Sequence, residues 1–127
     1  MNTELVEGLE HARALVAKGW AQGYVARNAA GDPVRPFEDG ACLFCAVGAL
    51  ERASGGDDNL YDAMCVALGA LLPHPTRDAS LIGAWNDTPN LTEADVLDLF
   101  DRAIANASGD EPARMVGADR GAMEAGQ

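Results

Sequence analysis

Cysteine and histidine side chains offer the most reactive chemistry in this chain. Cys42 and Cys45 form a Cys-x-x-Cys pair, a spacing found in redox-active dithiols. Cys45 with His74 would supply the thiol and imidazole of a cysteine hydrolase, completed by an orienting amide or carboxylate. Adding Cys65 gives four side chains able to bind zinc, although their spacing fits no standard zinc finger or knuckle.

The sequence around these residues favours a structural role for the cysteines. Residues 41–47 are apolar apart from two thiols, and an apolar setting raises a thiol pKa and lowers its reactivity. His74 stands between two prolines, which is typical of an extended, exposed loop. We therefore expect buried cysteines and no bound metal or cofactor, with a hydrolase that uses Cys45 and His74 as the alternative.

Polar residues in two segments could recognise a small polar ligand. Gln22 and Arg27 lie in one segment, and Asn86 and Asp87 follow Trp85 in the other. An arginine and an aspartate brought together by folding could hold such a ligand in a shared pocket. Alternatively, Asn86 and Asp87 hold a turn by accepting hydrogen bonds from nearby backbone N–H groups. The sequence leaves both interpretations open.

Carboxylates dominate the charge of this chain. Twenty Asp and Glu residues against nine Lys and Arg residues give a formal net charge of −11. Such a surface repels the phosphates of nucleic acids and anionic lipids, so we expect no direct binding to either. Three groups of acids lie on or at the start of predicted helices: Glu4, Glu7 and Glu10; Asp57, Asp58 and Asp62; and Glu93, Asp95, Asp98 and Asp101.

Carboxylates spaced along helices can occupy the positions that phosphates take in a basic groove. Our leading hypothesis is therefore a non-enzymatic protein-binding module for a partner with a basic surface. It would be a phage or mobile-element inhibitor of a host nucleic-acid-handling enzyme, of the anti-CRISPR kind. The alternative is a solvated surface that maintains solubility. The first candidates for partner contact are Asp95, Asp98 and Asp101, and the second are Asp57, Asp58 and Asp62.

Hydrophobic periodicity predicts the elements that position these residues. Apolar residues at helical spacing indicate a helix over residues 3–18. Strand formers followed by a turn-like cluster predict a hairpin within residues 20–36, with Trp20 and Tyr24 against the helices. Gly48 lies within the next expected helix and predicts that another helix approaches it closely.

Three more helices are predicted, together with one segment that is either a short helix or a turn. A buried helix is expected over residues 41–53, with Asp39 as its cap. The next helix begins in the acidic loop at 57–58 and ends before Pro73. Residues 79–85 form a short helix or a turn. Thr92 and the acid three positions later form a capping box for a helix over 92–107.

Composition sets the class and organisation of the protein. With 127 residues, 48% of them apolar, the chain can bury one core, so we expect one globular domain over 1–107 and a mobile acidic tail over 108–127.

The longest uncharged apolar run is about half of the roughly 20 residues a membrane span needs. Charges near the start argue against a signal peptide, and an odd cysteine count suits a reducing compartment. We expect a cytoplasmic, mainly α-helical protein, a compact bundle of about four helices with a small β-hairpin packed on one side.

Short motifs in a fixed order resemble a known family. They are Gly19-Trp20-x-Gln22-Gly23, Cys45-Ala46-x-Gly48-Ala49-Leu50 and Trp85-Asn86-Asp87, with Ala26-Arg27 and Gly31-x-Pro33-Val34 between the first two. Together they resemble a family of small uncharacterised bacterial and phage proteins over residues 5–107. The resemblance implies a compact, mainly helical domain and an origin on mobile elements. It supplies no catalytic residues, because the family has no established activity.

Overall fold

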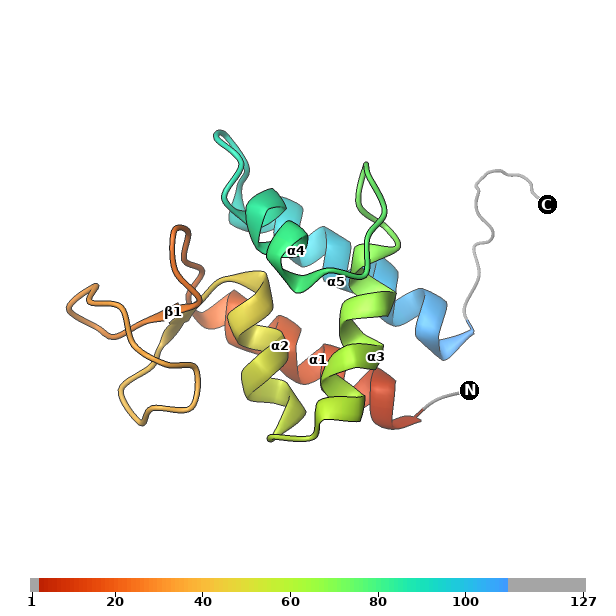
Figure 1. Ribbon diagram of the computed structural model, residues 1–127, viewed down its shortest axis with the longest axis horizontal. Helices are drawn as coiled ribbons and strands as arrows, with labels where there is room; N and C mark the ends of the chain where they lie inside the picture. The colour runs from red at the N-terminus through yellow and green to blue at the C-terminus, as the bar shows by residue number, and fades with distance from the viewer. Residues whose placement is uncertain (1–2, 110–127) are drawn as a thin grey trace.

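Five helices and one small sheet make up residues 3–109, the part of the chain that the computed structural model describes. A mainly helical fold with a small antiparallel β element packed on one side is confirmed (Figure 1). Most of the tail expected over 108–127 lies outside the described residues. The helices are α1 (Thr3–Lys18), α2 (Ala46–Ser54), α3 (Asp58–Gly69), α4 (Ala79–Asn86) and α5 (Glu93–Ser108).

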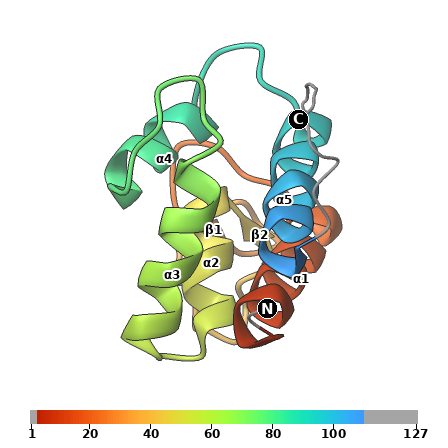
Figure 2. The same ribbon diagram turned by 90° about the vertical axis from the view of Figure 1, so that its right-hand side faces the viewer.

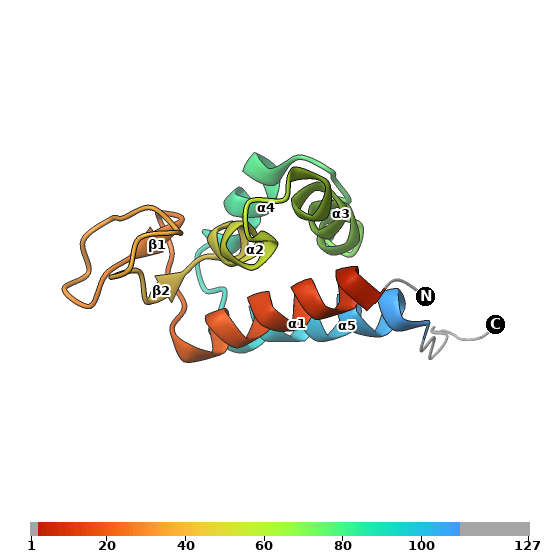
Figure 3. The ribbon, with the colours of Figure 1, turned by 90° about the horizontal axis from the view of Figure 1, so that it is seen from below.

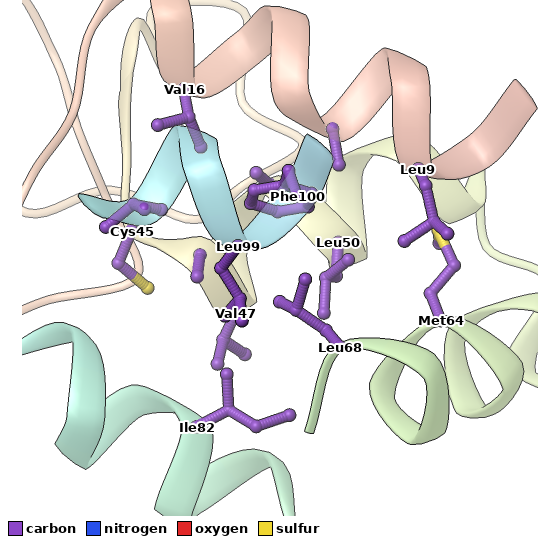
Figure 4. Packing of buried hydrophobic residues seen from close by; sticks show 14 of the residues in the cluster. Leu9, Val16, Cys45, Val47, Leu50, Met64, Leu68, Ile82, Leu99 and Phe100 are labelled. Atoms are coloured by element: carbon purple, nitrogen blue, oxygen red, sulfur yellow. The ribbon is translucent and has the colours of Figure 1, made fainter. Parts of the chain in front are cut away.

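The helices form two layers. α1 and α5 lie side by side and run in opposite directions, while α2, α3 and α4 cover one face of this pair (Figure 3). Figure 2 shows the same layers end-on, with α3 at the left and α1 and α5 at the right. The core lies between the layers, where Leu9, Leu50, Leu68 and Phe100 are fully buried (Figure 4).

Local sequence patterns define α1 and α5 correctly. Leu9, Ala12 and Val16 of α1 are buried, as their helical spacing predicts. α5 begins with the predicted capping box. Thr92 Oγ1 accepts a hydrogen bond from Asp95 N at 3.2 Å, and the Asp95 carboxylate accepts one from Thr92 N at 3.0 Å.

The predicted hairpin within residues 20–36 is wrong in its second strand. β1 (Ala26–Arg27) pairs instead with β2 (Leu43–Phe44), with Ala26 opposite Phe44. The expected partner segment makes one isolated antiparallel bridge, between Arg27 and Pro33, with Val34 N donating to the carbonyl oxygen of Ala26 at 3.0 Å. The helix predicted over 41–53 includes residues 43–44, because a short apolar run does not distinguish a helix from a strand.

α2 consequently starts later than predicted. Because β2 occupies residues 43–44, the helix begins at Ala46, and the predicted cap Asp39 lies well before it. Cys45 is the capping residue, and its Sγ accepts a hydrogen bond from Gly48 N at 3.3 Å. The thiol at position 45 therefore sits at the helix start rather than one turn inside the helix.

The loop before β1 packs directly on α2. A Cβ atom added to Gly48 would lie 1.9 Å from the carbonyl oxygen of Val25, so the close approach is made by this loop and not by another helix, as was expected. Trp20 is half-buried against the core, whereas Tyr24 is 50% exposed. The prediction that both aromatic rings face the helices is therefore wrong for Tyr24.

α3 and α4 are each capped by an aspartate. Asp57 accepts hydrogen bonds from the first N–H groups of α3, which ends at Gly69, earlier than the predicted end before Pro73. Of the two alternatives for residues 79–85, the helix is correct, and Asp78 caps it. Within residues 3–109, no helix combines the length and apolar character needed to cross a bilayer.

Candidate functional site

Asn86 lies where three segments of the fold meet. Its side chain, at the end of α4, is completely buried. Oδ1 accepts hydrogen bonds from Trp20 Nε1 at 2.9 Å and from Ala46 N at 3.0 Å. Nδ2 donates to the carbonyl oxygen of Ala21 at 3.0 Å. One buried amide thus connects α4 with the loop before β1 and with the first turn of α2.

The other three predicted ligand residues join this network. Asp87 Oδ1 accepts hydrogen bonds from Gly23 N at 2.8 Å and from Asn86 Nδ2 at 3.2 Å. Gln22 Nε2 donates to the carbonyl oxygen of Asn86 at 3.0 Å, and Arg27 Nη2 donates to that of Gln22 at 3.2 Å. The bond between positions 23 and 87 joins residues 64 apart, so the network holds a distant loop on α4.

Cys45 and His74 line two different cavities, which α4 separates. Cys45 borders a cavity of about 590 Å³ together with Asp87, and His74 borders one of about 320 Å³. Ala84 of α4 borders both cavities. Cys45 is 4% exposed, and burial raises the pKa of its thiol. The structure therefore does not bring together the thiol and imidazole that a cysteine hydrolase would need.

The remaining cysteines lie apart from this pair. Cys42 is exposed and precedes β2, whereas the sequence predicts it in the first turn of a helix. Cys65 is buried, and burial raises the pKa of its thiol. Within residues 3–109, no group of three or more His, Cys, Asp or Glu side chains is arranged to hold a metal ion.

The three candidate carboxylates on α5 all interact within the protein. Asp101 accepts a hydrogen bond from Arg13 of α1 at 2.6 Å, and Asp98 accepts one from Arg102 at 3.1 Å. Asp95 belongs to the capping box. Asp101 thus pairs with α1, while Asp95 and Asp98 border a groove. The three acids, spaced three residues apart along α5, therefore take part in different contacts.

The second acidic group lies elsewhere. Asp57 caps α3, and Asp58 and Asp62 are exposed near the start of the same helix. Figures 1 and 2 show the start of α3 and the start of α5 at opposite ends of the bundle. The two groups of candidate partner-binding residues therefore form separate surfaces.

Trp85 lies between two neighbouring cavities. One, of about 320 Å³, is bordered by His74 and Leu81, and the other, of about 550 Å³, by Asp95 and Asp98. Trp85 is half-buried, and its indole N–H donates no hydrogen bond to any residue within 3–109. We call the surface formed by the two cavities the Trp85 groove. It comprises Leu71, Leu72, Pro73, His74, Leu81, Ala84, Trp85, Thr88, Leu91, Asp95, Asp98, Leu99 and Arg102.

Comparison with known proteins places the chain in a family. Residues 1–106 match a family of unknown function, DUF6197. The chain belongs to the DUF6197 family. The matched range agrees with residues 5–107, over which the motifs resemble small uncharacterised proteins. No curated protein and no solved structure matches this DUF6197 chain. Its candidate site is therefore defined by its own geometry.

Sequence reasoning missed the apolar part of the Trp85 groove. The signal was present in α4, where Leu81 and Ile82 are adjacent. Neighbouring helix positions point in different directions, so both side chains cannot face the core. In this DUF6197 chain Ile82 is fully buried and Leu81 is 54% exposed.

Proposed function

We propose that this DUF6197 domain is a non-enzymatic protein-binding module whose contact site is the Trp85 groove. The observation that carries the proposal is an apolar surface around Trp85 with the carboxylates of Asp95 and Asp98 at its edge. The occupant would be a partner segment that places an apolar side chain beside Trp85 and a basic side chain beside the acids.

The centre of the groove has the character of a binding hot spot. Tryptophan is enriched among the residues that dominate interface energetics. Trp85 offers a partly exposed ring and an indole N–H that bonds to no residue within 3–109. Leu81 extends the apolar surface on one side, at 54% exposure. Exposed apolar surface rimmed by polar groups is typical of protein interaction sites.

The edge of the groove favours a basic partner. Arg102 is the only Lys or Arg among the described residues that line it, and Arg102 is already paired with Asp98 at 3.1 Å. Asp95 accepts a hydrogen bond from Thr92 N and forms no ion pair within residues 3–109. Together with a net charge of −11, this edge attracts a basic surface and raises the association rate at low salt.

A nucleic-acid-handling enzyme fits this chemistry as the partner class. Its phosphate-binding groove presents the basic side chains that these carboxylates would meet, and the negative field disfavours direct binding of nucleic acid. We propose inhibition of such an enzyme by occupation of its basic groove, as a phage or mobile-element protein of the anti-CRISPR kind would do. Asp101, Asp57, Asp58 and Asp62 would add long-range attraction from outside the groove.

The test compares capture of host proteins by immobilised variants. Asp95→Asn combined with Asp98→Asn removes two charges from the groove, and Leu81→Glu places a charge in its apolar part. Both variants should reduce capture of a basic protein at least about tenfold, since about 1.4 kcal/mol of lost binding energy corresponds to that factor. The matched control, Asp58→Asn with Asp62→Asn, removes the same charge far from the groove and should have a much smaller effect.

Two results would contradict the proposal. Equal losses in the groove variant and the α3 control would mean that net charge alone drives capture. Unchanged capture by Leu81→Glu would mean that the partner does not contact the apolar part of the groove. Circular dichroism of each variant checks that its helices are intact.

A further inference from the structure

A second candidate site lies on the other side of α4. This cavity, of about 590 Å³, is bounded by the loop before β1, the start of α2 and one side of α4. Its volume falls within the range of about 300–1,000 Å³ found for small-molecule sites. It does not include Trp85, Asp95 or Asp98, and it shares only Ala84 with the Trp85 groove.

Small residues on α4 keep this cavity open. Ala79, Ser80, Gly83 and Ala84 all border it and leave little side-chain volume on that side of the helix. A Cβ atom added to Gly83 would lie 3.8 Å from Val47 Cγ2, an ordinary contact distance. A larger side chain at position 83 would therefore extend into the cavity without a clash at its first carbon.

One charged side chain borders the cavity. Asp87 is the only Asp, Glu, Lys or Arg among the described residues that line it. Gly23 N and Asn86 Nδ2 both donate to Asp87 Oδ1, which holds the carboxylate in place. Asp87 Oδ2 accepts no hydrogen bond from residues 3–109 and is available to a ligand. The carboxylate is therefore preoriented and has one free oxygen.

The Arg27 guanidinium is not paired with this carboxylate. Arg27 donates to the carbonyl oxygens of Gly31 at 2.9 Å and Gln22 at 3.2 Å, and it forms no ion pair with Asp87. Arg27 holds the loop in place instead.

An aromatic ring borders the same cavity. Tyr24 is 50% exposed and directly follows Gly23, whose N–H bonds to Asp87. The ring and the carboxylate are thus presented by chain segments in direct contact. An aromatic face attracts ammonium groups, and a carboxylate accepts their hydrogen bonds. The other lining residues, among them Val47, are mainly apolar.

We propose that this cavity binds a small organic cation, an ammonium group carried on an apolar body. The ammonium would donate to Asp87 Oδ2 near the Tyr24 ring, and the apolar body would contact Val47 and the small side of α4. Anionic ligands are disfavoured because Asp87 carries the only formal charge among the described lining residues. This inference does not depend on the proposed protein-binding function.

The test uses two probes with the same apolar body, 2-phenylethylammonium and the neutral 2-phenylethanol. Amide chemical shifts in ¹H–¹⁵N spectra of the full chain would follow both titrations. The cation should bind about tenfold more tightly than the alcohol and shift the signals of residues 23–25, 45–47 and 79–87. A difference of ten corresponds to about 1.4 kcal/mol, a typical strength for a charge-assisted hydrogen bond.

Three variants locate the site. Asp87→Asn keeps an oxygen that can accept from Gly23 N and should lower cation affinity about tenfold while leaving alcohol affinity unchanged. Gly83→Leu fills the cavity and should abolish binding of both probes. Asp62→Asn removes a charge on α3, far from this cavity, and should alter neither.

The proposal fails if the cation produces no shifts, if both probes bind equally, or if Asp87→Asn leaves cation affinity unchanged. It also fails if Gly83→Leu folds and still binds the cation at the same signals. If Gly83→Leu does not fold, the comparison of the two probes in wild type and Asp87→Asn decides the question.

Discussion

Replacing Asn86 with alanine should lower the free energy of unfolding by about 3–5 kcal/mol. The substitution removes the hydrogen-bond partner of the Trp20 indole N–H, the Ala46 N–H and the Ala21 carbonyl oxygen. An unpaired buried polar group costs about 1–3 kcal/mol, and three groups at about 1.0–1.7 kcal/mol each give the stated total. Trp20 is only half-buried, so its N–H contributes least.

Urea unfolding followed by circular dichroism measures this loss. The matched control is Asn59→Ala on α3, where the exposed asparagine side chain makes no hydrogen bond within residues 3–109. The control should change stability by less than about 0.5 kcal/mol. A loss below about 1.5 kcal/mol in Asn86→Ala, with an unchanged dependence on urea, would refute the role assigned to the buried amide.

A double-mutant cycle isolates one bond of this network. Trp20→Phe removes the indole N–H that donates to Asn86 together with part of the ring packing, and alone it should cost about 1 kcal/mol or more. In the Asn86→Ala background the same change should cost less, because the bond is already absent. Equal costs in both backgrounds would show that the two side chains are not coupled.

Other substitutions test the packing and the thiols. Gly48→Ala should destabilise the fold by about 2 kcal/mol or more, because its Cβ would lie 1.9 Å from the Val25 carbonyl oxygen, and an unchanged urea midpoint would contradict this contact. Gly83→Ala should instead stabilise α4 by about 0.5–1 kcal/mol, and a lower thermal midpoint would show that the cavity wall has no room for a methyl group. Iodoacetamide should modify the exposed Cys42 before the buried Cys45, as peptide mass spectrometry would show; the reverse order would contradict the burial of Cys45. Burial raises the Cys45 pKa above its ordinary 9.0, so the stability linked to this thiol is complete below that pH and is lost as the pH rises through the folded-state pKa. Above that pH, the urea midpoint should therefore fall less in Cys45→Ser, which keeps an oxygen at the cap of α2, than in the wild-type protein. An equal fall in both proteins would assign the loss of stability to other groups.

The elements predicted correctly are those whose signals are local. The stripe of α1 and the capping box of α5 each depend on residues within a few turns, and both are confirmed. The start of α2 was wrong because residues 41–50 are apolar without interruption, and such a run contains no boundary. The pairing of β2 with β1, on the far side of a long loop, decided where the strand ended and the helix began.

The candidate site shows the same division between local and distant information. Gln22, Arg27, Asn86 and Asp87 were grouped by chemical type, and folding does place them in one network. The sequence could not predict that most of their polar groups bond to one another or to the backbone. Such hydrogen bonds depend on interatomic distances of about 3 Å. The sequence analysis predicted a pocket shared by all four residues as one alternative, but only Asp87 of the four lines the cavity on that side of α4.

The amino-acid sequence by itself determined that this protein is a mainly helical domain with a strongly negative surface. Hydrophobic period, capping residues and net charge are properties of short segments or of the composition, and they hold whichever way the helices are packed. Only the tertiary structure decided that Asp101 pairs with α1 while Asp95 and Asp98 border Trp85, and that α4 separates Cys45 from His74. The physical reason is that side chains from distant segments meet only when the core closes, and helical period does not specify which helix faces which.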